Sequence, residues 1–156
     1  MNNQSHYLTA EGAERLRQEL AELKGPRRIE LSRRLRTAIQ QGDLSENADY
    51  SKAKEDQPFL EGRIQQIEML LKNAEIISAS GSPNGVIGLG SVVLIREKGR
   101  QPIKYFLVGA QEADPRNGKI SHESPIGRVL LGHKAGETVK AQTPGGELVF
   151  EILEVE

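Results

Sequence analysis

The 156-residue chain contains no cysteine and no tryptophan, and only 4% of its residues are aromatic. Without cysteine it has no disulfide framework and no thiolate metal site, so the fold depends on its own core, and we expect a reducing compartment. No apolar run approaches the roughly 18 residues that a membrane span needs, and the polar stretch Met1 to His6 has no signal-peptide core. These absences predict a cytoplasmic protein with no membrane contact.

A large excess of either charge is also missing, because 21 Lys and Arg residues oppose 22 Asp and Glu for a formal net charge of −1. Non-specific binding to duplex nucleic acid requires a strongly basic surface, so this balance excludes a bulk polyanion binder. The hydrophobic content of 37% is adequate for one or two small domains.

Glycine and proline are scarce in the first half of the chain. Residues 1–76 hold four of the 16 glycines and two of the seven prolines, and the remainder lie in residues 77–156. The first half is therefore rich in helix formers and the second in turns and strands. We predict two domains, over 1–77 and 86–156, joined by a small, polar linker over 78–85.

The spacing of apolar residues predicts two long helices in the first domain. The first helix begins after Thr9 as its N-cap, and Gly25-Pro26 should kink or restart it. Its apolar positions are Ala13, Leu16, Leu20, Leu23, Ile29, Leu31, Leu35, Ala38 and Ile39. The second helix carries a heptad seam at Tyr50, Ala53, Gln57, Leu60, Ile64, Ile67, Leu71 and Ala74. A short turn at Gly42 makes them an antiparallel coiled-coil hairpin, whose tip at 42–50 is the candidate for function.

Two carboxylates lie at this tip. Asp43 and Glu46 are three residues apart, so in a helical turn both point the same way. Paired hard oxygens suit Mg²⁺, which binds one or two protein carboxylates and completes its coordination with water and phosphate. The alternative is that Asp43 caps the second helix and Glu46 closes a capping box, with Ser45 as another possible cap.

Charges are segregated behind the tip. Residues 27–36 hold five arginines against one glutamate, a local charge of +4, whereas residues 43–56 hold five acids against two lysines, a local charge of −3. Such runs are usually solvated helix faces. They would also suit an arginine stripe that guides a single-stranded nucleic acid backbone toward an acidic tip.

Turn signals in the second domain separate strands predicted at 91–96, 103–108, 138–142 and 148–155. Ser124-Pro125 has the chemistry of an N-cap followed by the first helical residue, which predicts a short helix over 126–131. The expected fold is α+β with a mainly antiparallel sheet. The three histidines are scattered and offer neither metal-ligand spacing nor a catalytic triad.

Three stretches of the chain resemble a known family. The tip GDLSENADY with the following SKAKEDQPFLEGRIQQIEMLLKNAEII, the early YLTAEGAERLRQEL, and the segment EADPRNGKISHESPIGRVLLGHKAGETVKAQTPGGELVFEI resemble the bacterial Gre transcript-cleavage (elongation) factors, more GreA than GreB. The resemblance covers nearly the whole chain in the right order. It implies two domains, an N-terminal all-α coiled-coil hairpin and a C-terminal α+β domain similar to the FKBP fold.

The resemblance also implies a function. The coiled coil of these factors enters the secondary channel of RNA polymerase, where the tip acids, here Asp43 and Glu46, help hold a catalytic Mg²⁺. The polymerase then cuts the 3′ end of RNA in a backtracked complex, so the factor is not itself an enzyme. Two-metal phosphodiester cleavage does need ligands for a second ion. The cofactor expected is therefore Mg²⁺ shared with the polymerase, with none bound stably by the chain alone.

The remaining site residues follow from the same resemblance. The family's ISxxSPIG pattern matches residues 120–127, so Ser121, Ser124 and Pro125 are candidates for docking on the channel rim. The alternative is that the last two only begin a helix.

The chain departs from the family at Ile39, where an arginine is usual, so Arg33, Arg34, Arg36 or Lys54 would contact the RNA instead. We expect a monomer. The alternative function is a secondary-channel regulator that inhibits or modulates polymerase without promoting cleavage.

Overall fold

The computed structural model describes residues 6–42, 46–78 and 82–156. These residues form two compact units, Ala13–Asn73 and a second unit that joins Met1–Gly12 to Ala74–Glu156. The ranges 1–77, 78–85 and 86–156 stay a prediction, and residues 79–81 of the expected linker lie outside the described residues.

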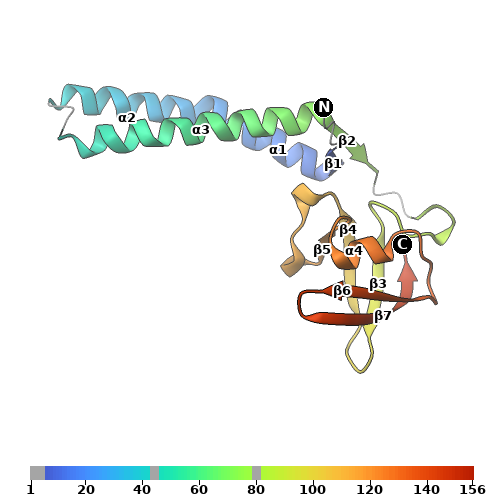
Figure 1. The fold of residues 1–156 in the computed structure, drawn as a ribbon. Coiled ribbons are helices and arrows are strands. Elements are labelled where there is room, and N and C mark those ends of the chain that lie inside the picture. The colour runs from blue at the N-terminus through green and yellow to red at the C-terminus, as the bar shows by residue number, and fades with distance from the viewer. Residues whose placement is uncertain (1–5, 43–45, 79–81) are drawn as a thin grey trace, which may run out of the picture. The chain divides into compact units, whose positions relative to one another are not determined.

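The first unit is a helical hairpin (Figure 1). One arm runs through α1 (Ala10–Glu22), the π-helical turn η1 (Leu23–Arg27) and α2 (Arg28–Gln40). The other arm is α3 (Ala48–Asn73), whose 26 residues extend about 39 Å at 1.5 Å per residue. The two arms run antiparallel, as the apolar spacing predicted.

Burial along the hairpin confirms part of the predicted seam and corrects the rest. In α3, Ala53, Ile64 and Ile67 are buried as expected, but Gln57 is exposed, and Leu70 is buried where the seam predicted Leu71. In α2, the buried residues are Leu31 and Ala38. The predicted apolar stripe was wrong at Ile29 and Ile39, which are 70% and 53% exposed. At 100° per residue, Ile29 is rotated 200° from Leu31 and so lies on the opposite side of α2, whereas Ile39 is the last residue but one of α2.

Gly25-Pro26 neither ends nor restarts the first arm. The chain passes through η1 with Glu22, Arg27 and Arg28 all in the right-handed helical region. A π turn accommodates the missing N–H of Pro26 by widening one turn, and α2 then continues. A second proline, Pro58, lies inside α3.

The ends of the two arms meet in a small sheet that the sequence did not predict. Thr9 caps α1 as expected, because the N–H of Gly12 donates to its Oγ1 at 3.0 Å. The four residues before α1 form β1 (His6–Thr9), which pairs in parallel with β2 (Ala74–Ile77). The helical seam therefore does not extend to Ala74, since α3 ends one residue earlier.

The rest of the second unit contains a five-stranded sheet with the order β5-β4-β3-β7-β6. All neighbours are antiparallel except β4 and β5, which are parallel. The strands are β3 (Val92–Glu97), β4 (Ile103–Val108), β5 (Lys119–Ser121), β6 (Thr138–Thr143) and β7 (Gly146–Val155). The four predicted strands are confirmed, and the three-residue β5 was missed.

One helix and three short turns complete this unit. The helix α4 (Pro125–Leu130) matches the predicted 126–131 within a residue. It packs against the sheet, where Leu130 joins Val93, Ile95, Phe150 and Ile152 in the core. The 3₁₀ turns are η2 (Pro83–Gly85), η3 (Ala110–Glu112) and η4 (Pro115–Asn117). The fold is thus a helical hairpin plus an α+β domain.

Candidate functional site

The tip of the hairpin is organised by Asn47. Its side-chain Oδ1 accepts a hydrogen bond from the N–H of Tyr50 at 3.1 Å, which makes it the N-cap of α3. Its Nδ2 donates to the carbonyl of Ala38 at 2.7 Å, near the end of α2. One side chain therefore begins the second arm and ties it to the first. The sequence contains this signal, an asparagine directly before the helix, whereas the caps predicted from it were Asp43 and Ser45.

The position of this cap decides between the two interpretations of the tip. Because α3 begins at Ala48, Glu46 precedes the N-cap and cannot be the third helical residue of a capping box, so that alternative was wrong. Asp43 and Ser45 lie outside the described residues. Glu46 is exposed and makes no hydrogen bond or ion pair with another described residue. Its carboxylate is therefore available to bind a partner.

One side of the hairpin, which we call the groove face, has a hollow lined by Arg34, Asp56 and Arg63, and its charges are paired. Arg34 contacts Asp56 at 3.2 Å, and Lys52 approaches the same carboxylate at 3.2 Å. The hydrogen bond from Lys52 lowers the pKa of Asp56 below its ordinary value and raises the pKa of Lys52. Further from the tip, Arg63 binds Glu19 through two hydrogen bonds of 2.7 and 3.0 Å.

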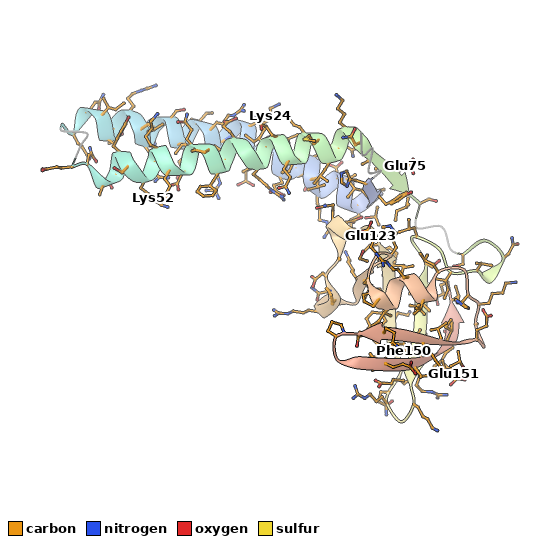
Figure 2. All side chains as sticks on the ribbon, in the orientation of Figure 1. Lys24, Lys52, Glu75, Glu123, Phe150 and Glu151 are labelled. Atoms are coloured by element: carbon orange, nitrogen blue, oxygen red, sulfur yellow. The ribbon has the colours of Figure 1, made fainter. Side chains whose placement is uncertain are left out.

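On the other side of the hairpin, which we call the cationic face, the ion pairs between described residues lie in the half away from the tip. Lys24 Nζ contacts Glu68 Oε1 at 2.9 Å. Arg28 forms a bidentate ion pair with Glu61, in which Nε donates to Oε1 at 2.9 Å and Nη2 donates to Oε2 at 2.7 Å. The hydrogen bond from Arg28 lowers the pKa of Glu61. Figure 2 shows Lys24 and Lys52, which belong to the two faces, at opposite edges of the hairpin.

The cationic face continues toward the tip with charges that pair with no described carboxylate. Arg36 lines the same hollow as Arg28, of about 410 Å³. Lys54 lies seven residues, or two turns, before Glu61 and so occupies the same side of α3. Within the described ranges, neither cation forms an ion pair. The structure thus brings Arg36 and Lys54 to one face.

The other two arginines of the predicted basic set are placed differently. Arg34 is held by Asp56 on the groove face. Arg33 borders the hollow of the cationic face and also, with Arg34, a hollow of about 390 Å³ beside Gln41 and Asp49 near the tip. The four predicted cations therefore do not form a single stripe.

The loop before α4 contains the predicted docking residues. Ser124 Oγ accepts from the N–H of Gly127 at 3.0 Å and donates to the carbonyl of Ser121 at 2.7 Å, which confirms its helix-capping role. Pro125 is the first residue of α4 and is exposed, as is Glu123, labelled in Figure 2. A Cβ on Gly127 would approach the Ser121 carbonyl oxygen to 2.0 Å, so the loop packs directly on the helix. A contact with a partner here stays a prediction.

Among the residues that the structure describes, no group of three or more His, Cys, Asp or Glu side chains could hold a metal ion. Over the same residues, no helix is long and apolar enough to cross a membrane.

Comparison with known proteins places the chain in a family. Residues 6–76 match "Transcription elongation factor, N-terminal", and residues 82–156 match "Transcription elongation factor, GreA/GreB, C-term". Transcription elongation factor GreA of Halalkalibacterium halodurans is 46% identical over 151 residues, which cover 96% of each chain. GreA of Clostridium botulinum strain Hall is 43% identical over 151 residues, covering 96% of this chain and 94% of its own.

A solved structure is also similar. The crystal structure of GreA factor homolog 1 (Gfh1) of Thermus thermophilus is 31% identical, covers 98% of this chain and 99% of its own, and superposes with a TM-score of 0.45. The two family matches together span most of the chain, and the two GreA proteins cover it at more than 40% identity. The chain therefore belongs to the GreA/GreB family of transcription elongation factors.

Proposed function

We propose that this chain acts on bacterial RNA polymerase as a transcript-cleavage factor of the GreA type. The hairpin enters the secondary channel, and its tip stimulates the polymerase's own cleavage of the RNA 3′ end in backtracked complexes. The observation that carries this proposal is the exposed carboxylate of Glu46, which pairs with no other described residue, beside a tip organised by Asn47. The chain contributes ligands and geometry, and the polymerase performs the hydrolysis.

The tip residues suit a magnesium ion that is shared with the polymerase. Glu46 offers a hard oxygen ligand, and Asp43, three residues earlier, would supply the second. Two carboxylates leave most of the octahedral coordination to water, RNA phosphate and the polymerase's acids. When bound, Mg²⁺ stabilises the attacking and leaving oxygens of phosphodiester hydrolysis. The cap at Asn47 would hold Glu46, the preceding residue, close to the start of α3.

The cationic face supports a path for RNA. Arg36 and Lys54 lack carboxylate partners among the described residues, so both remain available to contact phosphates. We expect Arg36→Ala with Lys54→Ala to reduce cleavage several-fold and to flatten its salt dependence. Arg34→Ala should have a smaller effect, because Asp56 already neutralises that guanidinium. An equal effect of all three substitutions would contradict this assignment.

The loop before α4 is the part of the chain that we expect to dock on the polymerase. The exposed Pro125, with Ser121 and Ser124 in the loop that leads into it, would contact the rim of the channel, and the chain would act as a monomer. Substituting Pro125 by Gly should weaken polymerase binding while the tip substitutions leave it unchanged.

The test is RNA cleavage in purified backtracked complexes. Asp43→Ala with Glu46→Ala should abolish stimulation and retain binding, whereas Glu55→Gln, an exposed acid further along α3, should cleave like the parent. A parent protein that inhibits transcription without stimulating cleavage would refute the proposal.

A further inference from the structure

The groove face contains a hollow of about 340 Å³ between the two arms. Its apolar lining comes from Leu23 and Leu31 of the first arm and from Leu60 of α3. It lies beside the π turn η1, to which Leu23 belongs, and Pro58, two residues before Leu60, has no N–H to donate within α3. The π turn departs from the repeat that regular knobs-into-holes packing requires.

Phe59 stands beside this hollow and is 74% exposed. A single exposed apolar residue needs no explanation, and Met69, which is 64% exposed on the same helix, is an example. Phe59 differs because it lines, together with the three leucines and with charged side chains, the hollow between the arms. Aromatic residues in this setting are typical anchors of protein interfaces.

The charges around the hollow are internally compensated. Each of its three arginines is near a carboxylate: Arg34 with Asp56 at 3.2 Å, Arg63 with Glu19 at 2.7 Å, and Arg27 with Glu30 at 3.9 Å. A polyanion would have to compete with these carboxylates, whereas no described carboxylate pairs with Arg36 or Lys54 on the cationic face. The hollow is therefore complementary to an uncharged apolar segment rather than to RNA.

We propose that this groove docks an uncharged, apolar segment of RNA polymerase, with one large apolar side chain inserted between Phe59 and the three leucines. The inference rests on the proposed function, because it assumes that the hairpin enters the polymerase. It assigns the two faces different partners, protein on the groove face and RNA on the cationic face. Phe59 would then contribute to binding and not to the chemistry at the tip.

The first experiment measures the affinity of the full chain for core polymerase without nucleic acid. We expect Phe59→Ala to raise Kd between 10- and 100-fold, as for an aromatic anchor, and Met69→Ala to change it less than twofold. The loss should persist at high salt, because an apolar contact is not screened. At saturating factor, Phe59→Ala should cleave backtracked RNA at the parental rate. Equal effects of the two substitutions, or no effect of Phe59→Ala, would overturn the proposal.

The second experiment identifies the occupant. Phe59 replaced by photoreactive p-benzoylphenylalanine, in a backtracked complex with labelled RNA, should cross-link to a polymerase subunit. Cross-linking to the RNA would instead make the groove a base-stacking site and refute the protein assignment. If the parent binds polymerase but does not stimulate cleavage, the proposed function fails while the docking result still stands on the affinity data. If the parent does not bind polymerase, both fail.

Discussion

Replacing Asn47 by alanine removes both side-chain hydrogen bonds that join the start of α3 to the end of α2. Loss of the N-cap to Tyr50 costs about 1 kcal/mol. Loss of the bond from Nδ2 to the Ala38 carbonyl costs about 1 kcal/mol more. A total of about 2 kcal/mol corresponds to roughly a 30-fold increase in local opening of the tip.

Native-state amide hydrogen exchange measures this opening directly. The N–H groups of Tyr50 and Ser51, which bond to Asn47, should exchange roughly 30-fold faster in Asn47→Ala. Asn47→Asp keeps the cap acceptor and loses only the donor to Ala38, so the expected increase is about fivefold. Unchanged exchange in Asn47→Ala, or equal effects of the two substitutions, would refute the claim that this side chain organises the tip.

The remaining predictions concern the two units separately. Gly127→Ala forces a Cβ to 2.0 Å from the Ser121 carbonyl oxygen and should destabilise the sheet domain by about 2–3 kcal/mol in denaturant unfolding. In Gly62→Ala the new Cβ meets nothing within 4 Å in α3, so this substitution should stabilise the hairpin by about 0.5–1 kcal/mol. An unchanged stability of Gly127→Ala would contradict the packing described. The pKa of Glu61 is lowered by Arg28, so its stabilising contribution is complete above the ordinary glutamate pKa of about 4.3 and disappears as the pH falls through the lower, folded value. Thermal unfolding followed by circular dichroism should therefore show the hairpin losing stability below about pH 5, with a shallower pH dependence in Glu61→Gln, and an identical profile for the two proteins would exclude the ion pair as a contributor.

Features carried by local patterns were predictable from the sequence. The strands at 103–108 and 138–142 lie between strong turn signals, and Ser124-Pro125 marks the start of α4 by its own capping chemistry. The α3 seam at Ala53, Ile64 and Ile67 follows from helical spacing alone.

Features that depend on distant partners were not predictable in the same way. The strands β1 and β2 are four residues each and pair across 68 positions, so neither has a local pattern that distinguishes it from a helix end. Ile29 and Ile39 were assigned to the buried stripe because they are apolar, and only the position of α3 shows which side of α2 is covered. The double role of Asn47 required knowledge that Ala38 lies beside it.

The recognition of the family rested on sequence motifs and is confirmed by matches over both halves of the chain. The site residues taken from it remain proposals. Of the two tip acids, Glu46 is placed by the structure, and its exposure agrees with a ligand that a partner completes.

The magnesium dependence of transcript cleavage tests the central claim most directly. Cleavage of RNA in a defined backtracked complex is measured over a range of Mg²⁺ concentrations with the parent, with Glu46→Gln and with Glu55→Gln. If Glu46 supplies a ligand, Glu46→Gln should need at least tenfold more Mg²⁺ for half-maximal cleavage, while Glu55→Gln follows the parent curve. Superimposable curves for the parent and Glu46→Gln would contradict the claim that the tip holds the metal.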